Sequence, residues 1–281
     1  MIKNGGKLLS FCLAAIILVP CLCACSDKTD PCIKIIDRLF SAEFSFDLEK
    51  LFTLFTDGQI SAFIDDYKVR VERSKSTGRL PDHEPQNRDD FIELSRKVSE
   101  HFRFGEVSFT YNITGIEDVT ESYLKDRRDY FVKCGLDLSK ITCVRKYTLG
   151  DVSAVFLGKF NFCKEHQTDE IDLFEYDGGW YCCSDSPLGM YGYVAFSDDY
   201  IFGEKTVEGT VREIGEGYIL IDGVLLLTDN TYDFSVDDVI SARVYKDSLM
   251  QCFYPGYPDW INISTLISAE PAEWIDVMIR D

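Results

Sequence analysis

Cys25 is the residue with the clearest prospective chemistry, because of the segments on either side of it. Two lysines make a short basic start, an apolar run follows over residues 8–24, and the chain turns polar at residues 26–30. This succession of a basic, an apolar and a small-residue region is the layout of a secretory signal. The apolar run contains a proline and is shorter than the about 20 residues that a transmembrane helix needs. The pattern therefore places a cysteine thiol at a processing boundary.

The end of the apolar run, Leu22-Cys23-Ala24-Cys25, resembles the lipobox of bacterial lipoproteins. In that family a small residue precedes an invariant cysteine, which receives a diacylglyceryl group before the signal is cleaved. The resemblance implies removal of residues 1–24, lipidation of Cys25 and attachment to the outer face of the cell membrane through the lipid anchor. Stable anchoring takes about two acyl chains, which such a lipoprotein carries. Ordinary secretory cleavage near Ala24 is the alternative.

Catalytic motifs are missing elsewhere in the sequence. HExxH, GxSxG, a P-loop and GxGxxG do not occur. Ser122 and Lys125 match SxxK, the start of a penicillin-recognising serine site, but no SDN or KTG partner accompanies them. A four-residue pattern on a predicted helix arises easily by chance. The sequence therefore predicts a protein that is not an enzyme, with no catalytic residue and no cofactor.

Metal-ligating residues are scattered rather than grouped. Nothing in the sequence brings together the three histidines, His83, His101 and His166. Acidic residues in predicted turns, Asp198-Asp199 and residues 229–233, supply oxygen ligands but lack the glycine and the final glutamate of an EF-hand loop. Acids that favour turns explain them better, and no metal site is expected.

The composition indicates an acidic protein with enough apolar residues for a packed core. Apolar residues make up 46% of the chain, and the formal net charge is −19. Removal of residues 1–24 takes away two lysines and no acid, which makes the charge −21. Roughly 260 residues remain, enough for one large domain or two ordinary ones. A surface of this sign repels phosphate backbones, which argues against nucleic acid as a partner.

The cysteine pattern does not indicate a disulfide framework. Seven of the eleven cysteines follow Cys25, and an odd number cannot all pair within one chain. No CxxC spacing occurs. Cys182 and Cys183 are adjacent and would face opposite sides of a strand. We expect most of these thiols to be small buried hydrophobes, with one or two bridges as the alternative.

Helices are predicted first, and strands dominate after them. Apolar residues at helical spacing predict helices from Pro31, with Asp30 as N-cap, and then around residues 48–55, 60–67 and 87–102. Residues 74–87 are polar and read as an exposed loop. Alternation predicts a strand at 107–114, helical spacing returns at 120–133, and strands follow at 141–148, 151–163, 168–176 and 179–184. Gly150-Asp151 and Asp177-Gly178-Gly179 are the expected tight turns.

This order of elements, with the closing hairpin Glu170–Tyr176 and Gly178-Gly179-Trp180-Tyr181, resembles the NTF2-like fold. The resemblance covers residues 31–186 and implies an α+β cone, in which helices pack on a curved antiparallel sheet. In enzymes of that superfamily, Asp or His inside the cone does acid–base work, whereas many secreted members have a filled cone. The residues that could line it are Tyr111, Tyr123, Arg127, Tyr147 and Trp180.

A second, all-β module is predicted at residues 206–281, after a packed, aromatic connector at 187–205. Five or six short strands with an Asp222-Gly223 hairpin turn indicate a small closed barrel. The pieces "GTVREIGEGYILIDG", "VDDVISARVY" and "YPDWINISTLIS" resemble a small β-barrel domain of unknown function in Firmicutes lipoproteins.

These features together predict a lipoprotein, tethered by residues 25–30, with a non-catalytic binding or interaction role at the cell envelope. Its expected partners are an envelope protein, a peptide or a wall component. The alternative is a hydrolase or isomerase that uses the cone pocket. An open cavity with a perturbed carboxylate or histidine at its floor would favour this enzyme.

Overall fold

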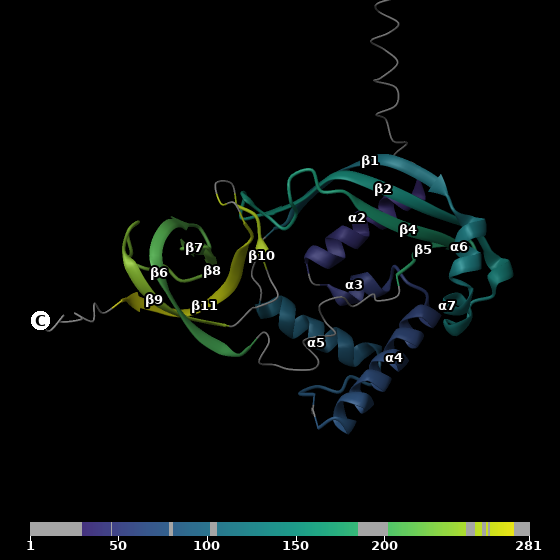
Figure 1. The fold of residues 1–281 in the computed structure, drawn as a ribbon, viewed down its shortest axis with the longest axis horizontal. Coiled ribbons are helices and arrows are strands. Elements are labelled where there is room, and N and C mark those ends of the chain that lie inside the picture. The colour runs from purple at the N-terminus through teal and green to yellow at the C-terminus, as the bar shows by residue number, and fades with distance from the viewer. Residues whose placement is uncertain are drawn as a thin grey trace, which may run out of the picture.

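The computed structural model describes residues 30–45, 47–78, 81–101, 106–184, 202–245, 251–254, 257 and 259–272. Within them the chain has the expected α+β composition, with a helical first part, an antiparallel sheet and a closed barrel (Figure 1). The leader, Cys25, most of the predicted connector and Asp198-Asp199 lie outside the described residues. Among the described helices, none is both long enough and apolar enough to cross a membrane.

The first helix begins where its capping chemistry predicts. Asp30 accepts a hydrogen bond from the backbone N–H of Cys32 at 2.9 Å and caps α2 (Pro31–Phe44). Pro31 occupies the first turn, where its missing N–H would have no intrahelical partner. The other helices of this part are α3 (Leu48–Phe52), α4 (Asp57–Ser76) and α5 (Arg88–His101).

An antiparallel sheet follows the helices, in the order β1-β2-β4-β5, with β3 beside β2. Its strands are β1 (Ser108–Asp118), β2 (Ile141–Phe156), β3 (Phe160–Asn161), β4 (Asp169–Tyr176) and β5 (Gly179–Cys182). Between β1 and β2 lie α6 (Thr120–Asp126), α7 (Arg128–Lys133) and a 3-10 turn, Leu138–Lys140. Asp177 and Gly178, both with positive φ, form the predicted turn between β4 and β5.

The predicted turn at Gly150-Asp151 is wrong, because the chain continues through it as the single strand β2. Asp151 has a φ of +50°, and two residues of β2 face Tyr111 of β1, so the positive φ serves a β-bulge. A Cβ on Gly150 would lie 2.8 Å from Cγ2 of Thr114, which explains the glycine by close approach of the two strands. The reversal comes later, at Leu157-Gly158.

The predicted single helix at 120–133 is divided at Arg127. This residue has φ −108° and ψ 15°, outside the α-helical region, and it ends α6 and precedes α7. The predicted exposed loop also begins later than expected, since α4 continues to Ser76.

The sheet curves over α2 (Figure 1). Side chains of the core cluster fill the space between them. Ile36 of α2 and Tyr147, Leu149 and Leu173 of the sheet have no exposed surface. At about 1.5–3 kcal/mol for each fully buried large apolar side chain, this layer is a main source of stability.

A closed five-stranded barrel forms the C-terminal part, as predicted. Its strands are β6 (Glu204–Gly215), β7 (Tyr218–Ile221), β8 (Val224–Leu227), β9 (Val239–Tyr245) and β11 (Ile261–Pro271), and the short β10 (Gln251–Cys252) pairs with β11. Closure depends on β11, which pairs parallel with β8 and antiparallel with β9. Its interior holds aliphatic side chains such as Val211, Leu226 and Ile240.

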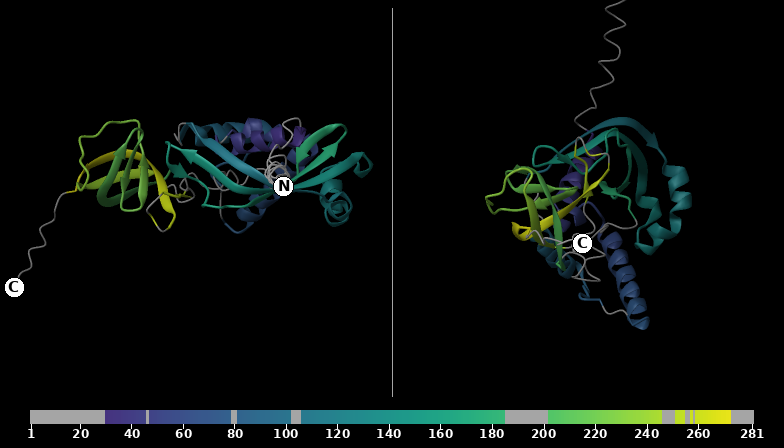
Figure 2. Two further views of the ribbon diagram at one scale, coloured as in Figure 1. Left: turned by 90° about the horizontal axis from the view of Figure 1, so that it is seen from above. Right: turned by 60° about the vertical axis from the view of Figure 1, so that its left-hand side comes forward.

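The barrel packs beside the helix–sheet part (Figure 2), and the two share one continuous apolar core. Barrel residues Leu225 and Ile263 belong to the same cluster as Phe156 and Phe160 of the sheet. A polar contact reinforces the junction, because Lys159 pairs with Glu213 of β6. Glu213 also accepts a hydrogen bond from the Tyr218 hydroxyl at 2.7 Å, and the Lys159 ammonium lies 4.9 Å from the Tyr218 ring centroid.

The seven cysteines of the described part are thiols outside any disulfide, and five of them are buried. Cys182 lies in the core beneath the sheet, whereas Cys183 packs on the other face, with α6 and α7, as expected for adjacent residues of a strand. Burial raises the pKa of Cys32 to about 11 and that of Cys252 to about 12. These thiols therefore behave as small hydrophobic side chains.

The first described residue, Asp30, is fastened to the central strand of the sheet. Its carboxylate accepts a hydrogen bond from the Tyr147 hydroxyl at 3.0 Å and lies 3.6 Å from a guanidinium nitrogen of Arg145. The Arg145 guanidinium in turn lies 5.0 Å from the ring centroid of Trp180. The Asp30 side chain is only 18% exposed. We call these four residues the Asp30 latch.

The latch predicts a measurable cost for Tyr147→Phe. This variant keeps the buried ring but removes the donor to a carboxylate, so we expect the free energy of unfolding to fall by about 1–3 kcal/mol. Urea unfolding measures the change. Tyr176→Phe is the matched control, because the Tyr176 hydroxyl makes no hydrogen bond within the described part of the chain. Equal stability of the two variants would contradict the latch.

Candidate functional site

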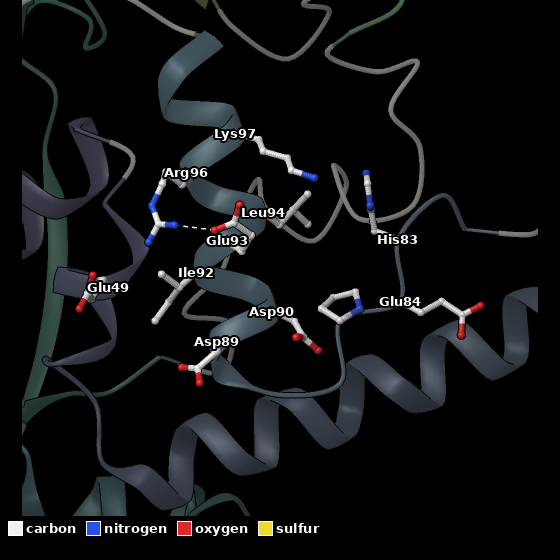
Figure 3. Close-up of a pocket in the computed structure, with 11 residues that line it drawn as sticks. Glu49, His83, Glu84, Asp89, Asp90, Ile92, Glu93, Leu94, Arg96 and Lys97 are labelled. Carbon is white, nitrogen blue, oxygen red and sulfur yellow. Dashed lines mark hydrogen bonds and ion pairs between the residues drawn. The ribbon is translucent and has the colours of Figure 1, made fainter.

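An open groove with a volume of about 660 Å³ lies on the helical layer. It is lined by Glu49 of α3, by the segment before α5 and by one side of α5 itself. Figure 3 shows Glu49 on one side of α5, and His83 and Glu84 on the other. The lining residues are Glu49, His83, Glu84, Pro85, Asp89, Asp90, Ile92, Glu93, Leu94, Arg96 and Lys97. We call this hollow the α5 groove.

The wall formed by residues 81–87 is held by local hydrogen bonds. Asn87 accepts the backbone N–H of Asp90 at 3.0 Å, and Asp90 accepts the backbone N–H of Gln86 at 2.7 Å. These contacts cap α5 and fix the turn that precedes it. The Lys75 ammonium reaches Glu84 at 2.6 Å, which ties this segment to α4. The groove is therefore built on ordered backbone rather than on a loose loop.

The charge of the α5 groove is predominantly negative. Five carboxylates face two permanent cations, Arg96 and Lys97, and Arg96 is already paired with Glu93. Glu49 and Asp89 make no ion pair among the described residues. The apolar floor consists of Pro85, Ile92 and Leu94. Such a surface suits a partner that presents both basic and apolar groups.

A second, smaller hollow of about 260 Å³ adjoins the groove and lies between α3 and α5. It shares Glu49, Ile92 and Arg96 with the groove, so the two hollows form one extended depression. Serine hydroxyls and Lys50 line the added part. An extended depression fits a polypeptide segment better than a compact small molecule.

The five residues expected to line the cone do not form a pocket. Tyr147 is fully buried in the latch, and Trp180 lies beneath Arg145. Tyr111 donates a hydrogen bond to Asp37 of α2 at 2.7 Å. Tyr123 packs in the cluster on the other face of the sheet, and Arg127 lies 5.9 Å from its ring centroid. The structure brings Tyr147 and Trp180 together and separates Tyr123 and Arg127 from them.

The other sequence candidates are dispersed. Ser122 donates to the backbone carbonyl of Val119 at 3.0 Å, as an ordinary helix serine does. His83 lines the α5 groove, His101 packs against the Tyr245 ring at 4.4 Å, and His166 pairs with Asp151 at 3.0 Å. Among the described residues, no group of three or more His, Cys, Asp or Glu side chains could hold a metal ion.

Apart from His83, the residues of the α5 groove were not singled out from the sequence as functional candidates. Asp89, Glu93 and Lys97 are spaced four residues apart, opposite the apolar stripe of α5, which is the pattern of any solvated helix face. Only the tertiary structure shows that Glu49, some 40 residues earlier, shares that face. No protein-family model matches the chain, and no curated protein or solved structure matches it either.

One carboxyl outside the groove has a strongly perturbed pKa. The pKa of the Glu43 carboxyl is raised from 4.5 to about 7, mainly because surrounding protein atoms desolvate it and secondarily because of the charge of Asp169, although the side chain reaches solvent. The folded state therefore binds this proton more tightly than the unfolded state. The contribution of Glu43 to stability therefore falls as the pH rises from about 4.5 to 7.

We expect Glu43→Gln to flatten this dependence. The variant should gain stability relative to the wild type above pH 7 and match it near pH 4, because the neutral glutamine side chain has no ionised form that could destabilise the folded state. Thermal unfolding across this pH range measures the effect. Glu121→Gln, on exposed α6, is the control and should leave the profile unchanged. An unchanged profile for Glu43→Gln would contradict the shift.

Proposed function

We propose that this protein is an extracytoplasmic lipoprotein, anchored through Cys25, which binds a basic polypeptide segment in the α5 groove at the cell envelope. We further propose that residues 31–186 are an NTF2-like domain whose cone is filled, followed by the barrel domain at 206–281. The observation that carries the binding role is the contrast between a filled interior beneath the sheet and an open depression on the helical face.

The anchor is supported by the sequence before the folded part. The leader, the small residue at position 24 and the abrupt polar turn after Cys25 fit lipoprotein processing. Asp30, the N-cap of α2, follows Cys25 after only a few polar residues. A strongly acidic body suits a protein that must stay soluble outside the membrane.

The choice of a basic partner follows from charge complementarity. The groove carries an excess of carboxylates, and its apolar floor adds contact area. Exposed ion pairs contribute only about 0.2–1 kcal/mol each, so several are needed for useful affinity and they act mainly on specificity and association rate. Protein and peptide partners meet this requirement, and so do basic wall-associated groups.

The second candidate is a hydrolase or isomerase. The pKa of Glu43, near 7, is its one favourable observation, since a general acid–base works best with a pKa near the operating pH. Against it, Glu43 lines neither the α5 groove nor the hollow beside it, and the four aromatic residues expected in the cone pack in the core clusters. We therefore rank binding first.

The anchor is tested by Cys25→Ala. We expect the wild type to incorporate radiolabelled palmitate and to fractionate with membranes, and the variant to lose both, because the acylated thiol is gone. Cys32→Ala is the control and should retain the label, since that thiol is buried in the core. Label that persists in Cys25→Ala would refute the anchor.

The groove is tested with a fluorescent peptide of alternating lysine and leucine residues, followed by anisotropy. The double variant Glu49→Gln/Asp89→Asn should weaken binding about two- to tenfold, since two exposed carboxylates are neutralised. The control Glu121→Gln/Asp129→Asn removes the same charge from α6 and α7 and should bind like the wild type. Equal weakening in both would show that net charge, and not the groove, attracts the peptide.

A further inference from the structure

We infer that the anchored protein is held in one orientation, with the Asp30 latch next to the membrane and the α5 groove facing away from it. This inference rests on the proposed lipidation of Cys25. It adds the direction from which a partner reaches the groove, which is the side of the wall or the aqueous exterior.

The latch limits how far the body can move from its anchor. Five residue steps separate Cys25 from Asp30, and an extended chain covers at most about 3.3–3.6 Å per residue, so the reach is about 17 Å. Asp30 is fixed to the body, because its carboxylate is held by Tyr147 and Arg145 of β2. The anchor therefore acts on the central strand of the sheet and not on a mobile arm.

The groove lies on the far side of the layers that begin at this latch. The sheet covers α2 and α3, and α4 and α5 lie beyond them (Figure 1), an arrangement also seen in the rotated view at the right of Figure 2. Packed helices lie about 8–10 Å apart, and a helix with its side chains is about 10–12 Å wide. Two helical layers thus separate the sheet from the outer surface of α5 by about 20 Å, more than the tether could span around the edge of the body.

Electrostatics favours the same arrangement. The body carries a formal charge of −21 after removal of the leader, and anionic headgroups repel it. The acid-rich groove is better placed far from the bilayer, beyond the Debye length of about 8 Å at physiological salt.

The orientation is tested by energy transfer to the membrane surface. A donor fluorophore is introduced as a non-natural amino acid at Lys34, one turn after the latch, or at Lys97 in the groove; both side chains are exposed. The full lipidated chain is inserted into phosphatidylcholine–phosphatidylglycerol vesicles that carry a headgroup-labelled acceptor lipid. We expect transfer from position 34 to be at least threefold more efficient than from position 97. Equal transfer, or stronger transfer from 97, would overturn the inference.

A variant with a longer tether distinguishes an orientation imposed by the latch and its short tether from simple attachment to the membrane. Insertion of 20 Gly/Ser residues between Ser26 and Asp27 should bring the two efficiencies close together, because the body can then rotate. A difference that survives the insertion would refute the role of the short tether. Flotation with vesicles is read in parallel: a wild type that fails to float, like Cys25→Ala, would overturn the anchor itself and the orientation with it.

Discussion

The packing of α2 against the concave face of the sheet is the constraint that shapes the rest of this molecule. A curved sheet creates a cavity wherever its concave face is left uncovered, and here Ile36 and Phe40 of α2 fill that space together with Tyr147 and Leu173. The same burial positions Asp30 so that its carboxylate meets Tyr147 and Arg145. The space beneath the sheet is thus filled, whereas α3, α5 and the segment between α4 and α5 form an open depression on the outer surface.

Local chemistry made much of the fold predictable. The cap at Asp30, the positive-φ turn at Asp177-Gly178 and the alternation along β1 each depend on a few neighbouring residues, and all three are found. The error at Gly150 has a clear physical cause, since a glycine can satisfy a turn or a close approach of two strands, and the sequence does not distinguish them. The break at Arg127 has no glycine or proline to indicate it.

The candidate site was much less predictable than the fold. A groove depends on which polar face of one helix lies beside another segment, and the carboxylates of Glu49 and Asp89 look like ordinary solvated residues along the chain. The junction between the sheet and the barrel was hard to predict for the same reason. Lys159 and Glu213 are 54 residues apart, and only the packing of Phe160 against Tyr218 brings their charges together. The spacing of apolar residues along the chain indicates which side chains are buried, but it does not indicate which surfaces come into contact.

At the extracytoplasmic location that we propose, the seven thiols of the described part affect how the chain must be made. In such an environment oxidants act on any accessible thiol, and before the chain folds every one of these side chains is exposed. Cys182 and Cys183 end on opposite faces of the sheet, so a bridge formed early by either would hold a strand in the wrong environment. Productive folding then requires that these thiols become buried before they are oxidised. The oxidising capacity of the surroundings therefore affects the yield of this protein.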